Sequence, residues 1–129
     1  MPSNYFFELT KHQYIALTTF RKSDAGVMTP VWFANDGDNR LVVTTAKSSG
    51  KAKRIRNNPR VELAPSDGRG KPLGDSVQAQ ARFIEGGAAM QALGLLKRKY
   101  GFQFTLIAGL NKLHGGSDDT RVLIEIVPL

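Results

Sequence analysis

Residues 42–59, with the sequence VVTTAKSSGKAKRIRNNP, carry the strongest local signals in this chain. The β-branched run from Val42 to Thr45 is typical of a β-strand. The residues at 48–50 (SSG) supply N-cap chemistry for a helix just before Lys51. Pro59 ends that helix, because the residue before a proline is pushed out of the α region. We therefore expect a strand, a hydroxyl-rich turn and a short basic helix.

The same stretch is strongly basic. No acidic residue occurs between Asp38 and Glu62, whereas seven basic residues do: Arg40, Lys47, Lys51, Lys53, Arg54, Arg56 and Arg60. Helical spacing turns Ala52 and Ile55 inward and leaves the cations around the outward side. Free N–H groups at a helix start, serine hydroxyls and lysines together favour an anion, most simply a phosphate. The alternative is a solvated basic helix on the surface.

Length and composition limit the class of protein. The chain has 129 residues, 41% of them hydrophobic, which fits one globular domain. It contains no apolar run near the length of a membrane span, no signal-peptide pattern at its start and no cysteine. We therefore expect a cytoplasmic protein without disulfides. The net charge of +7 suits an anionic ligand, nucleic acid or an anionic membrane face.

Outward from the central stretch, turn signals divide the chain into short segments. We expect six strands, at 14–20, 27–34, 40–45, 60–65, 76–85 and 121–127, and helices at 3–11, after residue 50 and at 88–100. Residues 67–74 form a surface hairpin loop, and 102–113 is ambiguous between helical and extended structure. This pattern predicts a mainly β fold, a small antiparallel barrel or sandwich with peripheral helices.

Three of these elements carry sharper expectations. Pro30 cannot donate to a ladder, so it marks an edge or a bulge where backbone groups are free for a ligand. Strand 76–85 alternates, with apolar residues at 77, 79, 81 and 83 on one face. In helix 88–100, Met90, Leu93 and Leu96 form the expected apolar face.

Side chains for acid–base or metal chemistry are sparse. His12 and His114 each stand alone, so a surface or capping role is favoured over a metal or base role. The glutamates at 8, 62, 85 and 125 are scattered and are interpreted as solvated or strand-end residues. No serine occupies a nucleophile elbow. If the chain is an enzyme, the difficult chemistry therefore belongs to a bound cofactor.

At this point the pattern resembles a known family. The motif GVMTPVWF at 26–33, the strand LVVTT at 41–45, Lys51 and the segment NPRV at 58–61 resemble the pyridoxamine-phosphate-oxidase-like split β-barrels. The match is closest to their deazaflavin branch, the F420-dependent oxidoreductases. The resemblance implies a six-stranded antiparallel Greek-key split barrel of the FMN-binding type. It also implies a homodimer that binds a flavin or deazaflavin at the subunit interface.

The resemblance also assigns residues to the cofactor. Four would line the ring system through main-chain contacts: Thr29, Pro30, Val31 and Trp32. Four would hold the phosphate: Thr45, Lys47, Ser48 and Lys51. Lys53 or Arg54 would bind the polyglutamyl tail of F420. Trp32 has a core interpretation as well. Tyr100 and Phe102 either close the pocket or pack the helix on the barrel.

The function implied by the resemblance is transfer of a hydride from reduced F420 to an electron-poor small-molecule acceptor. No catalytic side chain is assigned. The alternatives are an FMN-dependent oxidoreductase and a non-catalytic flavin-, deazaflavin- or tetrapyrrole-binding protein. The sequence lacks the arginine-bearing segments and C-terminal extension of the flavin-binding oxidases, which argues against pyridoxamine phosphate as substrate. Nucleic-acid binding is disfavoured because the basic stretch has no interleaved aromatic residues for base stacking.

Overall fold

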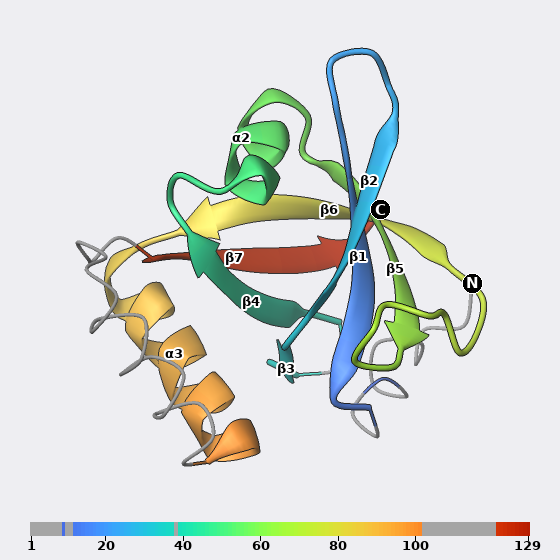
Figure 1. Cartoon of the computed structure of the whole chain (residues 1–129). Coiled ribbons are helices and arrows are strands. Elements are labelled where there is room, and N and C mark those ends of the chain that lie inside the picture. Colours follow the sequence, from blue (N-terminus) through green and yellow to red (C-terminus); the bar gives the residue numbers. More distant parts are fainter. Residues whose placement is uncertain (1–8, 10–11, 38, 102–120) are drawn as a thin grey trace.

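The computed structural model describes residues 9, 12–37, 39–101 and 121–129. A curved antiparallel sheet of seven strands, in the order β2-β1-β5-β6-β7-β4-β3, forms its centre (Figure 1). The strands are β1 (Tyr14–Phe20), β2 (Gly26–Val31), β3 (Ala34–Asn35), β4 (Leu41–Ala46), β5 (Arg60–Ser66), β6 (Val77–Ile84) and β7 (Arg121–Pro128). The prediction of an antiparallel, mainly β fold is confirmed.

The seventh strand arises from the segment expected to be a single strand at 27–34. β2 ends at Val31, which pairs with Ile15 in β1, and β3 begins at Ala34, which pairs with Val42 in β4. β2 and β3 are the two ends of the sheet order, so residues 32–33 carry the chain from one edge of the barrel to the other. Pro30 therefore lies on an edge strand, as predicted, where its missing N–H is tolerated.

The barrel interior is filled by alternate side chains of the strands. Buried residues from β1, β4, β5, β6 and β7 form one cluster, and Phe33 within it is fully buried. In β6 the predicted alternation is confirmed: Ala79 and Ala81 are buried and Val77 and Phe83 pack against the same cluster. Closing the sheet around these side chains removes them from water, which is the main driving force for this fold.

Helix α2 (Gly50–Asn57) connects β4 to β5 and lies over one end of the barrel (Figure 1). Ser49 is its N-cap, and the Ser49 hydroxyl accepts from the Ala52 N–H at 3.1 Å. The helix ends at Asn57, two residues before Pro59. Ala52 and Ile55 are its buried residues, as helical spacing predicted. Ile55 joins the barrel core and so fixes which side of the helix faces water.

Helix α3 (Gly86–Tyr100) covers part of the outer face of the sheet. Its buried residues are Ala92, Leu96 and Tyr100, spaced four apart. The prediction that Met90 belongs to the apolar face is wrong, because Met90 is 76% exposed. The stripe that meets Ala34 and Val42 of the sheet determines the rotation of the helix, and Met90 lies off that stripe. Gly86 and Gly87 open the helix and do not precede it.

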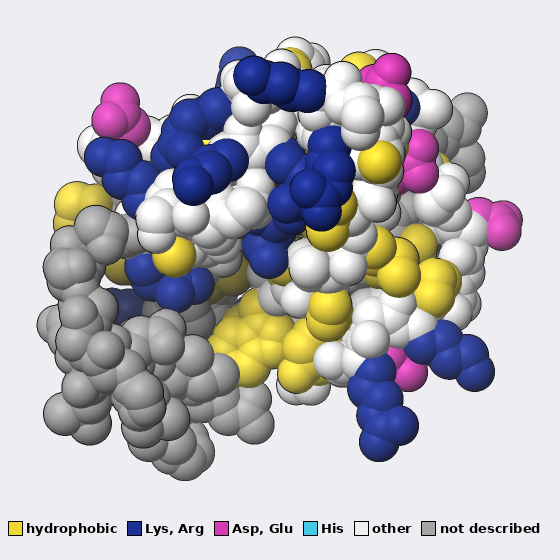
Figure 2. Space-filling view, turned by 45° about the horizontal axis from the view of Figure 1, so that its top comes forward, with side chains coloured by type: hydrophobic (Ala, Val, Ile, Leu, Met, Phe, Trp, Pro, Cys, Tyr) yellow, Lys and Arg dark blue, Asp and Glu magenta, His cyan; other side chains and the backbone are white. Residues whose placement is uncertain are grey.

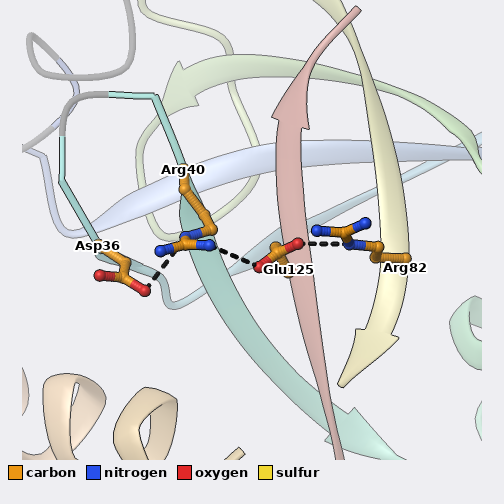
Figure 3. Close-up of polar contacts among 4 residues, drawn as sticks. All are labelled: Asp36, Arg40, Arg82 and Glu125. Atoms are coloured by element: carbon orange, nitrogen blue, oxygen red, sulfur yellow. Dashed lines mark hydrogen bonds and ion pairs between the residues drawn. The ribbon is translucent and has the colours of Figure 1, made fainter. Parts of the chain in front are cut away.

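The interpretation of Glu125 as a solvated residue is also wrong. Glu125 lies on β7, between β6 and β4, and is only 5% exposed. Arg40 Nη1 lies 3.1 Å from Glu125 Oε1, and Arg82 Nε forms an ion pair with Oε2 (Figure 3). Arg40 also pairs with Asp36 at 3.2 Å. The guanidinium groups of Arg82 on β6 and of Arg40, just before β4, therefore compensate the burial of this carboxylate.

Some of the predicted segments include residues that the structure does not describe. The helix at 3–11 is described only at Leu9, which is buried, and the segment 102–113 and His114 lie outside the described residues. The loop at 67–74 does connect the β5–β6 hairpin, and the Asp67 carboxylate accepts from two loop N–H groups, of Arg69 and Lys71. In the part of the chain that the structure describes, no helix is long and apolar enough to cross a membrane.

Candidate anion-binding site

The turn between β4 and α2 is built from hydroxyl groups. Thr45, which is 7% exposed, donates through Oγ1 to the Ser49 hydroxyl at 3.1 Å. Ser49 in turn caps α2, so both hydroxyls hold the turn in place. No described residue accepts a hydrogen bond from the N–H of Gly50 or Lys51. Two backbone donors are therefore available for an anion at the start of this helix.

Lys51 links the turn to the edge strand. Its ammonium group donates to Thr29 Oγ1 on β2 at 3.1 Å. Burial lowers the pKa of Lys51, and the positive charges of Arg54 and Arg121 lower it further. An opposite charge beside a half-buried ammonium favours its charged form. A bound anion would therefore relieve the electrostatic cost of this arrangement.

Two arginines lie near enough to Lys51 to affect its charge. Arg54 Nε donates to Thr19 Oγ1 at 2.6 Å, and Thr19 is fully buried. The Arg54 guanidinium also lies over Gly50, with Nη1 2.8 Å from the position that a Cβ atom would take there. Arg121, the first residue of β7, lies against Thr44 with Nη2 3.5 Å from the Thr44 carbonyl oxygen. Three cations from two elements therefore surround the start of α2.

Arg121 was not among the residues predicted for this site. It enters the site because β4 and β7 pair antiparallel, which places Arg121 opposite Ala46 at the end of β4. The pairing joins residues 75 positions apart, a separation that no local motif encodes. The only available signal was that Arg121 opens the last predicted strand.

The predicted phosphate and tail residues divide into two groups. Thr45, Lys51 and Arg54 lie together where α2 meets β1, β2 and β4, and Lys51 joins them to Thr29 of the predicted ring contacts. Lys47, Ser48 and Lys53 are exposed. Lys and Arg side chains gather on the face of the molecule that carries α2 (Figure 2). The second group therefore belongs to an open basic surface around the first.

The predicted ring-contact residues lie differently. The Val31 side chain is in the barrel core, so only its main chain is available to a ligand. Pro30 packs against the 67–74 loop, where a Cβ on Gly70 would lie 3.4 Å from its Cδ. The Trp32 ring is half-buried and stacks on Tyr100, with centroids 4.2 Å apart and planes 4° apart. Thr29 thus reaches α2, whereas Trp32 packs against α3.

Tyr100 has a structural role. Its hydroxyl accepts from the Phe33 N–H at 3.0 Å and lies 2.7 Å from the Gln13 carbonyl oxygen and 2.9 Å from that of Phe33. Burial raises the pKa of Tyr100 to about 12, so the phenol is neutral at physiological pH. Tyr100 therefore packs α3 on the barrel, which is the second of the two roles predicted for it. Phe102 lies outside the described residues.

The donor set suits an anion with several oxygens. It combines an ammonium, two guanidiniums, hydroxyls and free backbone N–H groups, all of which bind phosphate or carboxylate oxygens. Within the described ranges, no three His, Asp or Glu side chains lie close enough together to hold a metal ion. His12 is not part of this donor set; its backbone N–H donates to the Leu9 carbonyl oxygen. The residues present therefore fit the phosphate of a cofactor.

Known proteins resemble this chain in sequence and in fold. The sequence model of the family described as pyridoxamine 5'-phosphate oxidase matches residues 2–128. A solved structure named F420 reductase aligns with a TM-score of 0.61 at 20% identity, over 100% of this chain and 96% of its own. HutZ, the heme storage protein of Vibrio cholerae, aligns with a TM-score of 0.71 at 14% identity, over 95% and 87%.

A heme-binding protein of Mycobacterium smegmatis aligns with a TM-score of 0.63 at 14% identity, over 98% of this chain and 51% of its own. Among curated proteins, none matches this sequence. These structural matches are too low in identity to show more than a shared fold. The family match is different in kind, because it covers nearly the whole chain. The chain therefore belongs to the pyridoxamine 5'-phosphate oxidase family and has its antiparallel split-barrel fold.

Proposed function

We propose that this protein is an F420-dependent oxidoreductase that reduces an electron-poor small-molecule acceptor. The observation that carries the proposal is the contact between Lys51 on α2 and Thr29 on β2. It brings the start of the basic helix against the edge strand whose main chain the family resemblance assigns to the cofactor ring. The fold shared with an F420 reductase supports the same assignment at the level of architecture.

In this proposal each part of the site has a separate task. Lys51, Arg121 and the N–H groups at the start of α2 hold the phosphate. Lys53 and Arg54 face the carboxylate-rich tail, which FMN lacks. The edge strand β2, paired on one side only within the described sheet, offers outward main-chain groups to the ring. When bound, the reduced deazaflavin supplies the hydride, and the chain orients the acceptor and excludes water from it.

The proposal includes a homodimer. The outer face of β1, β2 and β5 carries an open groove of about 370 Å³, and Met28 on the edge strand is 48% exposed. The groove residues include Thr18, Met28, Glu62, Ala64, Pro72 and Asp75. A second subunit over this face would cover Met28 and supply the other wall of the cofactor groove. Sedimentation of the cofactor-loaded protein at micromolar concentration should give a dimer, and a stable monomer would contradict it.

The test of function is a parallel titration with F420, FMN and haem, followed by absorbance and fluorescence. We expect F420 to bind most tightly. Lys51→Ala should weaken F420 binding by about one to two decades, because a charge-assisted contact contributes roughly 1.5–3 kcal/mol. Lys97→Ala, on an exposed site of α3, serves as the control and should leave the affinity unchanged. Tighter binding of FMN or haem than of F420 would refute the proposal.

A non-catalytic carrier is separated from an enzyme by turnover. Reduced F420 bound to the protein should be oxidised by quinone or enone acceptors at a rate that saturates with acceptor concentration. Oxidation no faster than in free solution, together with tight binding, would instead identify a carrier. Haem is included in the titration because two proteins that share the fold are named for haem.

A further inference from the structure

Lys99 on α3 has an unusual environment. Its ammonium nitrogen lies 3.5 Å from the centroid of the Phe33 ring and 5.4 Å from that of Tyr100. The nitrogen is shielded from solvent and has no hydrogen-bond partner among the described residues. The aromatic faces stabilise its charge in part. They do not replace the three hydrogen bonds that an ammonium group normally makes, and no described residue accepts one from it.

The cavity beside Lys99 has a volume of about 300 Å³. It is lined by Ala34, Asn35, Leu95, Arg98 and Lys99. Ala34 and Leu95 give it an apolar wall, and Arg98 adds a second cation. Neither cation forms an ion pair with a described residue. Among the described residues, the cavity thus combines an apolar surface with two cations that form no ion pair.

Electrostatics and size indicate what fits. Burial alone lowers the pKa of Lys99 to about 8, with no contribution from a neighbouring charge. Among the described residues that line the cavity, the charged neighbour of Lys99 is Arg98, and Tyr100 next to it in the chain is neutral. The ammonium form still predominates at neutral pH, so the site would accept one negative charge. The volume is at the lower end for ligand sites, which run from about 300 to 1,000 Å³.

We propose that the cavity between α3 and β3 is a binding site for a small organic carboxylate. The carboxylate would accept hydrogen bonds from Arg98 and from Lys99, whose ammonium group would turn from the Phe33 ring into the cavity. The apolar body would lie on Leu95 and Ala34. This site shares no residue with the anion site at α2, because it is built from α3 and β3. It therefore does not depend on the proposed function.

Benzoate is the probe for this site, and NMR titration of the lysine side chains is the measurement. Comparison with the spectrum of Lys99→Met assigns the Lys99 resonance. We expect saturating benzoate to raise the pKa of Lys99 by at least one unit, because the anion stabilises the ammonium form. Acetate has no apolar body and should bind at least several-fold more weakly.

Variants on the same helix complete the test. Lys99→Met should weaken benzoate binding at least tenfold, while the exposed control Lys97→Met should stay within twofold of wild type. Arg98→Gln should weaken it several-fold and provides a second variant should Lys99→Met disturb folding. F420 affinity should be unchanged in all three. An unchanged Lys99 titration in benzoate, equal binding by Lys99→Met, or a larger shift with inorganic phosphate than with benzoate would overturn the proposal.

Discussion

At the scale of single residues, the charged form of Lys51 is disfavoured in the free protein and would be stabilised by a bound anion. Its ammonium is half-buried, donates to Thr29 and lies in the field of Arg54 and Arg121. All three causes that lower its pKa also make the charged form less favourable in the folded state than in the unfolded chain. A phosphate at this point would supply the missing negative charge.

The lowered pKa of Lys51 has a consequence for stability against pH. Between the folded-state pKa and the ordinary value of 10.5, the unfolded chain binds more protons at this position than the folded chain. The free energy of unfolding of the wild type, relative to Lys51→Met, should therefore rise with pH across that window. Urea denaturation of both proteins at several pH values measures the difference. A difference that falls as the pH rises would show that the pKa is not lowered.

Ser49 and Ser48 offer a matched pair for the start of α2. The Ser49 hydroxyl accepts from Ala52, whereas Ser48 is exposed and does not cap the helix. Ser49→Ala should lower the free energy of unfolding by about 1 kcal/mol, the typical contribution of an N-cap. Ser48→Ala should stay within about 0.5 kcal/mol of wild type, as exposed substitutions do. Equal losses for the two variants in urea denaturation would contradict the observed cap.

The sequence predicted those residues whose role is set by near neighbours. Ser49 and Pro59 act on the helix beside them, so the bounds of α2 followed from local rules. Arg121 and Glu125 take their roles from strand pairing, which places Arg121 beside the α2 turn and Glu125 between two arginines. Local patterns contain no information on such pairing. For this reason the sequence-based prediction left out Arg121 and placed Glu125 in solvent.

At the scale of elements, Tyr100 fastens the end of α3 to the segment that joins the two barrel edges. Its hydroxyl contacts the backbone of Phe33 and of Gln13, and its ring stacks on Trp32. Phe33 is fully buried, so its N–H has no access to water if the hydroxyl is removed. One side chain therefore secures the position of α3 against the chain between β2 and β3.

Removing only the hydroxyl tests this connection. Tyr100→Phe keeps the ring and its stacking, but it leaves the Phe33 N–H buried without a partner. We expect the free energy of unfolding to fall by roughly 1–3 kcal/mol, the cost of an unsatisfied buried donor. Tyr14→Phe is the control, because the Tyr14 hydroxyl makes no hydrogen bond to a described residue, and its effect should be within about 0.5 kcal/mol. Similar small changes for both variants would show that the bonds of Tyr100 contribute little.

The two helices also show where sequence-based prediction of elements holds. In α2, Ala52 and Ile55 are the only apolar residues between Gly50 and Asn57, so only one face could be buried. In α3, apolar residues surround much of the helix, and Met90 and Leu96 were equally plausible from spacing. Contact with β3 and β4 selected the stripe of Ala92, Leu96 and Tyr100. Periodicity therefore determined the buried face only where it left a single choice.

At the scale of the whole molecule, charge is distributed unevenly. The chain carries a net charge of +7, and Lys and Arg side chains gather on the face with α2 (Figure 2). Within this face, Lys51 is half-buried and held by Thr29, whereas Lys53 is exposed. Salt screens exposed charges far more than partly buried ones. For an anion that contacts both lysines, salt should therefore weaken the contact with Lys53 more than the contact with Lys51.

This difference predicts how the choice between F420 and FMN responds to salt. FMN offers one phosphate to the half-buried group at the start of α2, whereas F420 adds tail carboxylates that reach the exposed cations. We expect the preference for F420 over FMN in calorimetric titrations to shrink as salt rises from about 50 to about 500 mM. Over this interval the Debye length falls about threefold, which weakens the contacts between the tail carboxylates and the exposed cations. The double change Lys53→Ala, Arg54→Ala should reduce the preference at low salt by roughly 2- to 30-fold, since ion pairs of exposed or partly exposed side chains contribute about 0.2–1 kcal/mol each.

The control for this prediction is Lys71→Ala, Lys97→Ala, which removes the same charge from the β5–β6 loop and from α3. It should leave the preference for F420 nearly unchanged if the contacts are local to α2. Equal losses in the two double variants would assign the preference to net charge alone. Because Arg54 also donates to Thr19, the free energy of unfolding of the first variant must be compared with that of wild type. A preference that neither salt nor the first double change reduces would show that the basic surface around α2 does not bind the tail.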